Sequence, residues 1–272
     1  MTEPFGIGDL AGRCVVVTRP AQQAASLLDA LRVAGAEPLF FPVIEIVPLA
    51  DAAPLRALAA ILADYDVAFF VSANAVEQTL AVLPPALWPA SLRVVTVGPG
   101  SARALRAHGF EDVMLPSSSF DSEGVLAMAE MQPAAIAGKR VLILRGDGGR
   151  ELLATGLRER GARVDVQGCY QRRPVAADPT DLLARFATKR LDALSFTSSE
   201  GARNFANVLD SASGAGGARA MLAALPCFVP HPRIEEYLRS LGAQQLVLTG
   251  AGDAALILAL RQYFGTTSDS FG

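Results

Sequence analysis

Short apolar runs alternate with amphipathic segments from the start of the chain. Residues 14–18 (CVVVT) form an uninterrupted, mostly β-branched run, which is typical of a strand buried on both faces of a parallel sheet. Residues 22–33 follow with leucines at helical spacing, and Gly35 provides the end signal of a helix. Residues 40–48 are again extended and bounded by prolines. The pattern therefore predicts a strand, a helix and a second extended segment.

The same order recurs further along the chain at a fixed distance. Residues 15–48 read VVVTRPAQQAASLLDALRVAGAEPLFFPVIEIVP, and residues 141–174 read VLILRGDGGRELLATGLRERGARVDVQGCYQRRP. Gly35 and Gly161 are 126 positions apart (161 − 35), and the other matches have the same shift. A repeat of this length is the size of a domain. We expect two copies of one α/β unit, with any site between them. The repeat predicts a turn at 145–149 and a helix at 150–160 in the second copy.

Further strands, each followed by a helix, complete both copies. They are predicted at residues 66–72, 94–97, 192–198 and 227–229. The helix-ending glycines Gly109 and Gly242 differ by 133 positions (242 − 109), so the second copy has gained seven residues. We expect this insertion to be a flexible loop at residues 211–219 (SASGAGGAR). Strands that alternate with helices predict doubly wound parallel sheets.

The equivalent extended segments, residues 40–48 and 166–174, have a consequence for the domains. If the first carries the chain into a second domain, the second carries it back. This predicts a discontinuous first domain (1–39 and 175–272), a continuous second domain (49–165) and a two-stranded connector. A tandem arrangement with a boundary near residue 130 is the alternative.

Composition narrows the classes of function. The chain has 272 residues, a net charge of −3 and a pI of about 5.5, which argues against a nucleic-acid-binding face. Three cysteines without ligand spacing predict neither a disulfide framework nor a zinc site. The N-terminus has no signal-peptide pattern, and no apolar run approaches the ~20 residues of a membrane span. We expect a soluble cytoplasmic protein.

Small polar or glycine-rich turns, two of them with an arginine, follow the predicted strands at the points where helices begin. Their candidate residues are Thr18, Arg19, Ser72, Asn74, Gly98, Ser101, Arg145, Thr197, Ser198 and Ser199. In parallel α/β sheets, backbone N–H groups and helix dipoles at this edge favour an anionic ligand. The alternative is that these residues are helix caps only. No dinucleotide or P-loop glycine pattern occurs, so NAD and ATP are not expected.

Groups with strong catalytic chemistry are scarce. His108 and His231 form no triad or metal-ligand pattern with neighbouring residues. Tyr170 stands on the second connector where the first copy has Ile44, and is a candidate proton donor. A tyrosine packed at an interface is the alternative. An enzyme built this way would act by positioning and electrostatics.

The ordered motifs resemble those of the uroporphyrinogen-III synthase family, in its proteobacterial form. They include VVVTRPAQQAASLLDALRVAGAEPLFFPVIEI, FVSANAV, VTVGPGSARALRAHGF, VLILRGDGGRELLATGLRERGA and SFTSSEGARNF, and extend from about residue 14 to 260. The resemblance implies two α/β domains and a two-stranded connector. It also implies hydroxymethylbilane, a linear tetrapyrrole with eight carboxylates, as substrate. The product would be uroporphyrinogen III, formed without a cofactor or metal.

The resemblance also implies roles for single residues. Tyr170 matches the tyrosine proposed to assist departure of the substrate hydroxyl, and Ser101 takes the place of a threonine. Residues expected to line the site are Thr18, Ser72, Ser122, Thr197 and Ser198. The turn 231–234 (HPRI) departs from the family pattern, and Arg233 is expected to supply a charge contact there.

Two other functions fit the scarcity of catalytic groups. One is a non-catalytic two-lobed binding protein for an acidic small molecule, and the other is a regulatory domain descended from the synthase. We expect a monomer, because nothing in the chain predicts an interface helix.

Overall fold

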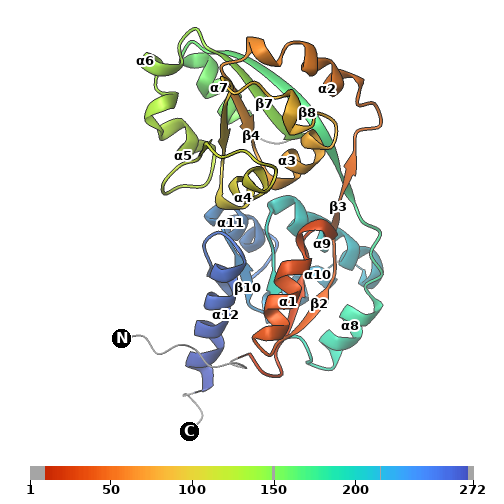
Figure 1. Ribbon diagram of the computed structural model, residues 1–272. Helices are drawn as coiled ribbons and strands as arrows, with labels where there is room; N and C mark the ends of the chain where they lie inside the picture. The colour runs from red at the N-terminus through yellow and green to blue at the C-terminus, as the bar shows by residue number, and fades with distance from the viewer. Residues whose placement is uncertain (1–9, 149–150, 215, 269–272) are drawn as a thin grey trace. The chain divides into compact units, whose positions relative to one another are not determined.

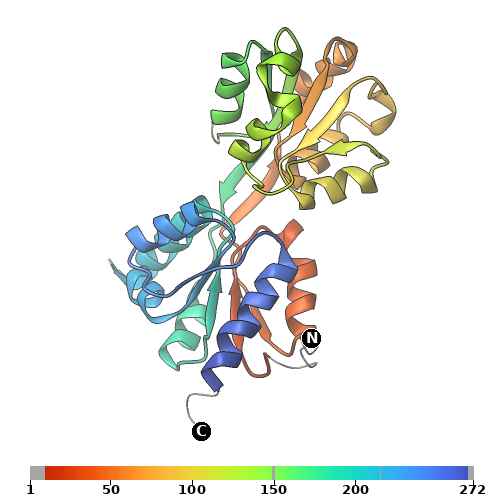
Figure 2. The same ribbon diagram turned by 90° about the vertical axis from the view of Figure 1, so that its left-hand side faces the viewer.

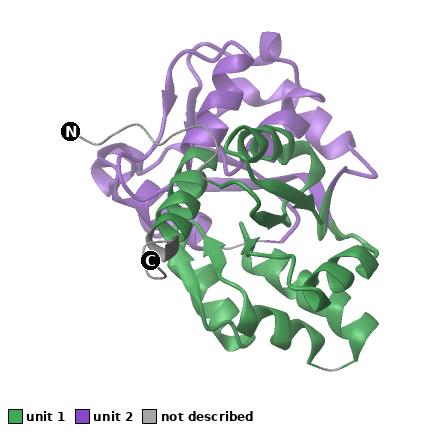
Figure 3. Cartoon of the chain, turned by 90° about the horizontal axis from the view of Figure 1, so that it is seen from below, with its two compact units in different colours: residues 1–45, 173–272 green, residues 46–172 purple. Residues whose placement is uncertain are grey.

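The computed structural model describes residues 10–148, 151–214 and 216–268. The chain divides into two compact units (Figure 3): unit 1 comprises residues 1–45 and 173–272, and unit 2 comprises residues 46–172. Each unit contains a sheet of parallel strand pairs with helices packed on it (Figure 1). The predicted α/β fold class with parallel sheets is therefore confirmed.

The sheet of unit 1 has five strands in the order β11-β10-β9-β1-β2. The strands are β1 (Cys14–Val17), β2 (Glu37–Phe40), β9 (Ala193–Ser195), β10 (Cys227–Val229) and β11 (Leu246–Leu248). All of their pairings are parallel. The central strand β1 is buried along its whole length, as its continuous apolar run predicts.

Helices cover both faces of this sheet. They are α1 (Ala25–Val33), α8 (Thr180–Ala187), α9 (Ser199–Ser213), α10 (Gly217–Ala224), α11 (Pro232–Ser240) and α12 (Asp253–Ser268). Figure 2 shows α1 and α12 together on one face, where Leu27 and Leu31 pack with Val15 and Leu260. A 3₁₀ turn precedes α1, and Gly35 follows it with a left-handed φ of +89°, so glycine is required at that position.

The sheet of unit 2 has the order β3-β8-β7-β4-β5-β6. The strands are β3 (Ile44–Pro48), β4 (Val67–Phe70), β5 (Arg93–Thr96), β6 (Val113–Met114), β7 (Arg140–Gly146) and β8 (Arg163–Pro174). From β8 to β6 all pairings are parallel. The boundaries between the two units fall inside β3 and β8, which are neighbours in this sheet.

The longest described helices belong to unit 1, and those of unit 2 have at most nine residues. They are α2 (Ala53–Ala57), α3 (Ala73–Leu80), α4 (Pro99–Ala107), α5 (Ser122–Ala127), α6 (Pro133–Ile136) and α7 (Leu152–Glu159). One core of this unit joins Phe69, Val95 and Ile143 of the sheet to Val125 and Leu157 of the helices. Gly149 and Arg150, which the predicted turn and helix include, lie outside the described residues.

An aspartate clamps two neighbouring strands together in unit 2. Asp66 precedes β4, and its carboxylate accepts the backbone N–H of Arg140 at 2.8 Å and the Nζ of Lys139 at 2.9 Å. The backbone N–H of Asp66 in turn donates to the carbonyl oxygen of Arg140 at 2.9 Å. These bonds lower the pKa of Asp66, chiefly through the backbone N–H of Arg140.

Unit 1 contains the same clamp, displaced by the repeat. Asp192 precedes β9 and accepts the N–H of Cys14 at 2.8 Å and the guanidinium of Arg13 at 2.9 Å. The shift between the two aspartates (192 − 66) and between the two basic residues (139 − 13) is 126 in both cases. Each unit therefore combines the first half of one copy with the second half of the other.

The predicted extended segment 40–48 is divided between the two sheets, because β2 ends at Phe40 and β3 begins at Ile44. Pro42 has no N–H to continue the ladder. The N–H of Phe41 still donates to Val17, and the ring of Phe41 packs edge to face against Phe205 at 5.9 Å.

The predicted flexible loop 211–219 is wrong for the described residues. Helix α9 continues to Ser213, and α10 begins at Gly217. Gly214 and Gly216 have positive φ values of +81° and +98°, which form the turn between the helices. The carboxylate of Asp210 accepts the N–H of Ala218 at 3.0 Å, so a side chain from α9 stabilises the start of α10.

Candidate functional site

Both sheets reverse their strand order beside strands that carry predicted site residues. The reversal lies between β1 and β9 in unit 1 and between β7 and β4 in unit 2. Ligands of open parallel α/β sheets bind outside the carboxyl ends of the strands at such a switch point. The residues there are Thr18, Arg19, Thr197, Ser198 and Ser199 in unit 1, and Ser72, Asn74 and Arg145 in unit 2.

Two of the predicted residues in unit 2 contact each other. The hydroxyl of Tyr170, on β8, lies 3.2 Å from Oγ of Ser72, and either oxygen can donate. Ser72 is the N-cap of α3, and its Oγ accepts the N–H of Ala75 at 3.1 Å. The positive end of the α3 dipole therefore lies near the phenol oxygen. Asn74 is partly exposed in the first turn of the same helix.

A β-bulge determines which residue of β7 Tyr170 faces. Arg145 pairs with Gly168, whereas the next residue, Gly146, pairs with Tyr170, so Cys169 is the additional residue. The thiol of Cys169 donates to the carbonyl oxygen of Arg145 at 3.0 Å. Burial raises the pKa of Cys169 to about 11, so the thiol stays protonated at neutral pH and is not a nucleophile.

Helices α4 and α5 begin close to each other at this edge. Gly98 is the N-cap of α4, and Ser101 lies in its first turn with 8% of its surface exposed. A Cβ placed on Gly98 would lie 3.6 Å from the Cβ of Phe120, which precedes α5. Ser122 is the first residue of α5 and not its cap. The cap is Asp121, whose carboxylate accepts the N–H of Gly124 at 2.8 Å. The sequence reasoning missed Asp121, although an aspartate before an apolar helix is a capping signal.

The hydroxyl of Thr18 bonds within the sheet of unit 1. Thr18 is 3% exposed, and its Oγ1 donates to the carbonyl oxygen of Ser195 at 2.7 Å. The Oγ of Ser195 donates to the carbonyl oxygen of Val16 at 2.9 Å. These reciprocal bonds hold β1 and β9 together at the switch point.

The polar residues that follow β9 form the start of helix α9. Ser198 is the N-cap, and its Oγ accepts the N–H of Gly201 at 3.0 Å. Thr197 is exposed, and Ser199 is the first residue of the helix. Ser198 and Ser72 are repeat partners (198 − 72 = 126) and cap their helices in the same way. Both serines therefore act as helix caps, as one of the two interpretations of the sequence predicts. The backbone N–H groups in the first turns of these helices still face the switch points.

The two arginines at the switch points form ion pairs inside their own units. Arg19 bonds to Asp253 at 2.6 Å, and the Arg19 side chain is 12% exposed. Asp253 begins α12 and also accepts the hydroxyl of Ser26 at 2.8 Å. Arg145 bonds to Glu151 at 2.5 Å. Carboxylates of the protein thus partly balance both charges before any anion binds.

Arg233 lies at a third strand end of unit 1, beyond β10. His231 is the N-cap of α11, and its Nδ1 accepts the backbone N–H of Arg233 at 3.1 Å. The ring nitrogen that accepts must be unprotonated in this arrangement. The Arg233 residue is exposed in the first turn of the helix.

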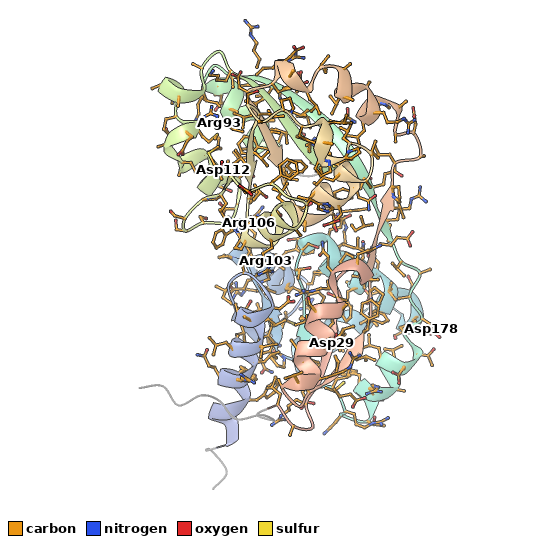
Figure 4. All side chains as sticks on the ribbon, in the orientation of Figure 1. Asp29, Arg93, Arg103, Arg106, Asp112 and Asp178 are labelled. Atoms are coloured by element: carbon orange, nitrogen blue, oxygen red, sulfur yellow. The ribbon has the colours of Figure 1, made fainter. Side chains whose placement is uncertain are left out.

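A cavity of about 320 Å³ lies at the opposite, amino-terminal edge of the unit 2 sheet. Trp88 and Phe110 line it with their rings 5.8 Å apart in an edge-to-face arrangement, together with Glu111 and Asp112. Figure 4 labels Asp112 together with Arg93, the first residue of β5. The described lining includes none of the predicted site residues, so this cavity is separate from the switch point.

In the part of the chain that the structure describes, no three or more His, Cys, Asp or Glu side chains are grouped in a way that would hold a metal ion. Among the helices of that part, none has the length and apolar character needed to cross a membrane.

The predicted residues thus gather at two edges. In unit 2, Ser72, Asn74, Gly98, Ser101 and Arg145 lie at the ends of β4, β5 and β7, with Tyr170 opposite Gly146. In unit 1 the group comprises Thr18, Arg19, Thr197, Ser198, Ser199 and Arg233. The sequence places Gly146 in the predicted turn 145–149 but does not reveal its contact with Tyr170, which depends on the bulge. It does not reveal the role of Asp253 either, because Asp253 is 234 residues from Arg19 in the chain.

Comparison with known proteins places the chain in a family. The family described as uroporphyrinogen-III synthase HemD matches residues 25–257. The chain is 36% identical to the uroporphyrinogen-III synthase of Salmonella typhimurium over 188 residues, which cover 68% of this chain and 76% of that protein. It is 32% identical to the one from Synechococcus elongatus over 268 residues, covering 95% and 98%.

Solved structures agree on the fold. A mutant uroporphyrinogen III synthase of Thermus thermophilus superposes with a TM-score of 0.61 at 17% identity, covering 93% of this chain and 99% of that chain. The Helicobacter pylori enzyme gives 0.55 at 18% identity, covering 92% and 99%. Since the sequence match extends over most of both chains, this chain belongs to the uroporphyrinogen-III synthase family.

Proposed function

We propose that the chain is a uroporphyrinogen-III synthase, which converts hydroxymethylbilane into uroporphyrinogen III with loss of water and inversion of ring D. The nearly full-length match to the Synechococcus elongatus synthase carries this proposal. The architecture is compatible with the substrate, which has eight carboxylates. Helices α3, α4 and α9 begin at the carboxyl edges of the sheets, and the N–H groups of their first turns suit anionic groups.

Tyr170 is the proposed general acid. Its proton passes to the hydroxymethyl oxygen of the substrate, the carbon–oxygen bond breaks, and water departs. The pyrrole ring that remains is a protonated, cationic azafulvene. The phenol oxygen then carries negative charge, which the hydroxyl of Ser72 at 3.2 Å can stabilise by donating a hydrogen bond. The 4% exposure of Tyr170 limits competing contacts of the ring with water.

The ring closure requires steering. The electrophilic carbon must attack the substituted carbon of ring D, giving a spiro intermediate, whereas uncatalysed closure uses the free carbon and gives the I isomer. Holding the substrate in one geometry is therefore the main task of the site. The residues proposed to bind substrate are Thr18, Arg19, Ser72, Asn74, Gly98, Ser101, Ser122, Arg145, Thr197, Ser198, Ser199 and Arg233.

We propose further that the protein acts as a monomer in the cytoplasm, without a cofactor or metal ion. We also propose that it consists of a discontinuous first domain (1–39 and 175–272), a second domain (49–165) and two connector strands (40–48 and 166–174). The helices and strands of the two units support this division, since each sheet is complete within the residues assigned to it apart from the connectors.

Isomer analysis tests the proposed function. The purified protein is incubated with hydroxymethylbilane, the products are oxidised, and the I and III isomers are separated by chromatography. We expect the III isomer to predominate, whereas a reaction without protein gives the I isomer. A product mixture equal to that control would contradict the synthase assignment and would favour a binding or regulatory protein.

A further inference from the structure

The ring of Tyr170 lies directly against the backbone of Gly146. A Cβ built on Gly146 would lie 2.6 Å from the ring carbons Cε2 and Cζ and 3.0 Å from the phenol oxygen. Real Cβ atoms do not approach other atoms this closely. Gly146 is not among the glycines with positive φ, so the position requires space and not an unusual backbone conformation.

The backbone on both sides of Tyr170 is held by hydrogen bonds, so a new side chain at Gly146 would displace the ring and not the strand. The carbonyl oxygen of Tyr170 accepts the N–H of Asp147 at 3.0 Å. The carboxylate of Asp147 accepts the N–H of Arg172 at 2.8 Å. Before Tyr170, the thiol of Cys169 holds the bulge to β7. The extra residue reverses the alternation of side chains, and Cys169 and Tyr170 are consecutive buried residues as a result.

The repeat provides an internal comparison. The partners of Gly146 and Tyr170 in the first copy are Pro20 and Ile44 (146 − 20 and 170 − 44 are both 126). Ile44 lies near the first turn of α9, since its Cδ1 lies 3.9 Å from a Cβ placed on Gly201. A large side chain thus lies near the start of a helix in both units, Tyr170 at α3 and Ile44 at α9. At these repeat positions, glycine and a hydroxyl-bearing ring stand in unit 2, whereas proline and isoleucine stand in unit 1.

We infer that Gly146 is a positioning residue for Tyr170: the absence of a side chain lets the ring lie against β7 with its hydroxyl at Ser72. This inference rests on the proposed function, in which Tyr170 is the acid. A Cβ at Gly146 would push the ring away, until its nearest carbons lie about 3.4 Å from that Cβ, the ordinary contact distance, instead of 2.6 Å. A shift approaching 1 Å is enough to lower turnover by about 100-fold when it misplaces a reacting group.

Two glycines of the same bulge make a matched test. Gly146→Ala introduces the clash, whereas a Cβ on Gly168 would have nothing within 4 Å and Gly168 has no positive φ. We expect Gly146→Ala to lower kcat by roughly 10- to 100-fold with KM changed less than about 2-fold. Gly168→Ala should keep the kcat of the unchanged protein. Equal kcat values for the two variants, with the III isomer still formed, would overturn the positioning role and leave the proposed function intact.

A double-mutant cycle separates positioning from a general structural effect. If Gly146 acts through the Tyr170 hydroxyl, Gly146→Ala should have little further effect on kcat in a Tyr170→Phe background. If Gly146→Ala lowers kcat by the same factor with and without the Tyr170 hydroxyl, the alanine damages the site in another way.

Should Gly146→Ala fail to fold, Ser72→Gly tests the other side of the same arrangement. Glycine is nearly as good a helix N-cap as serine but has no hydroxyl to hold the phenol. We expect a kcat loss that disappears in the Tyr170→Phe background; additive losses would contradict the inference.

Discussion

A tyrosine that is only 4% exposed can act as an acid only where its hydroxyl remains near the substrate. In Tyr170 the ring faces Gly146, and the hydroxyl reaches Ser72 at the start of α3. Oγ of Ser72 already accepts the N–H of Ala75, and its own proton is available for the phenol oxygen. If Ser72 donates, the proton of Tyr170 is left for the substrate. The direction of one hydrogen bond thus decides whether the phenol is an effective acid.

The Tyr170→Phe variant tests this role at the level of one oxygen atom. The ring and its contact with Gly146 are retained, so the free energy of unfolding should change by no more than about 1 kcal/mol. Turnover should fall by roughly 10- to 100-fold, in the lower range for loss of a general acid. The measurements are kcat with hydroxymethylbilane and thermal unfolding. An unchanged kcat would remove Tyr170 from the acid role.

Single residues differ in how far the sequence reveals them. Tyr170 stood out because it departs from its repeat partner Ile44, and Ser72 because small polar residues cap helices. The contacts of Gly146 could not be predicted, since a bulge changes which residues face each other across two strands. The ion pair of Arg19 with Asp253 joins residues that are 234 positions apart, and no local pattern signals it.

Among the contacts between neighbouring strands, the aspartate clamps follow most clearly from the repeat. Each clamp joins an acidic residue before one strand to a basic residue and an N–H at the start of its neighbour. Parallel strands distant in sequence need such contacts to set their register, because no hairpin turn does so.

Replacing Asp66 with asparagine should weaken the unit 2 clamp. The side chain of Asp66 is 36% exposed, so the expected loss at pH 7 is only about 1 kcal/mol. Since folding lowers the pKa of Asp66, its carboxylate stabilises the protein above about pH 4. That stabilisation is lost as the pH falls through the pKa of the folded state. The difference in unfolding free energy between Asp66→Asn and the unchanged protein should therefore shrink below pH 4.

The matched change, Asp192→Asn, gives a control in the other unit. Chemical denaturation of both variants, followed by fluorescence and far-UV circular dichroism, measures the losses. Trp88 lies in unit 2, so its fluorescence should respond more to Asp66→Asn than to Asp192→Asn. A pH-independent loss for Asp66→Asn would show that the carboxylate charge is not what stabilises the clamp.

The elements themselves were predictable where periodicity and end signals coincide. Strand β10 has the predicted bounds, and α11 ends at Ser240, two residues before the predicted helix-ending Gly242. Helix α10 was not predictable, because the glycine-rich sequence before it suggests a loop. Its start depends on Asp210, which reaches it from the last turns of α9. A tertiary contact has overridden local composition there.

For the whole molecule, the arrangement of the two copies predicts how a cut chain behaves. An inserted protease site after Ala50, an exposed position beyond β3, would separate residues 1–50 from the rest. Strand β1 is the centre of a five-stranded sheet and is buried on both faces. We therefore expect the short fragment to stay bound after cleavage. Native size-exclusion chromatography followed by mass spectrometry measures this directly. Release of residues 51–272 as a folded species would support the tandem alternative instead.

The position of β1 also determines when the sheet of unit 1 can form during synthesis on the ribosome. Its partner β9 begins 176 residues after β1 ends (193 − 17). At about 5 to 20 residues per second, the wait is on the order of 10 to 35 s. Meanwhile the whole of residues 46–172 emerges as one continuous piece and can fold. Strand β1 thus stays without three of the other four strands of its sheet, β9, β10 and β11, until the second unit is complete. Nascent chains of this protein should therefore need protection at their N-terminal end.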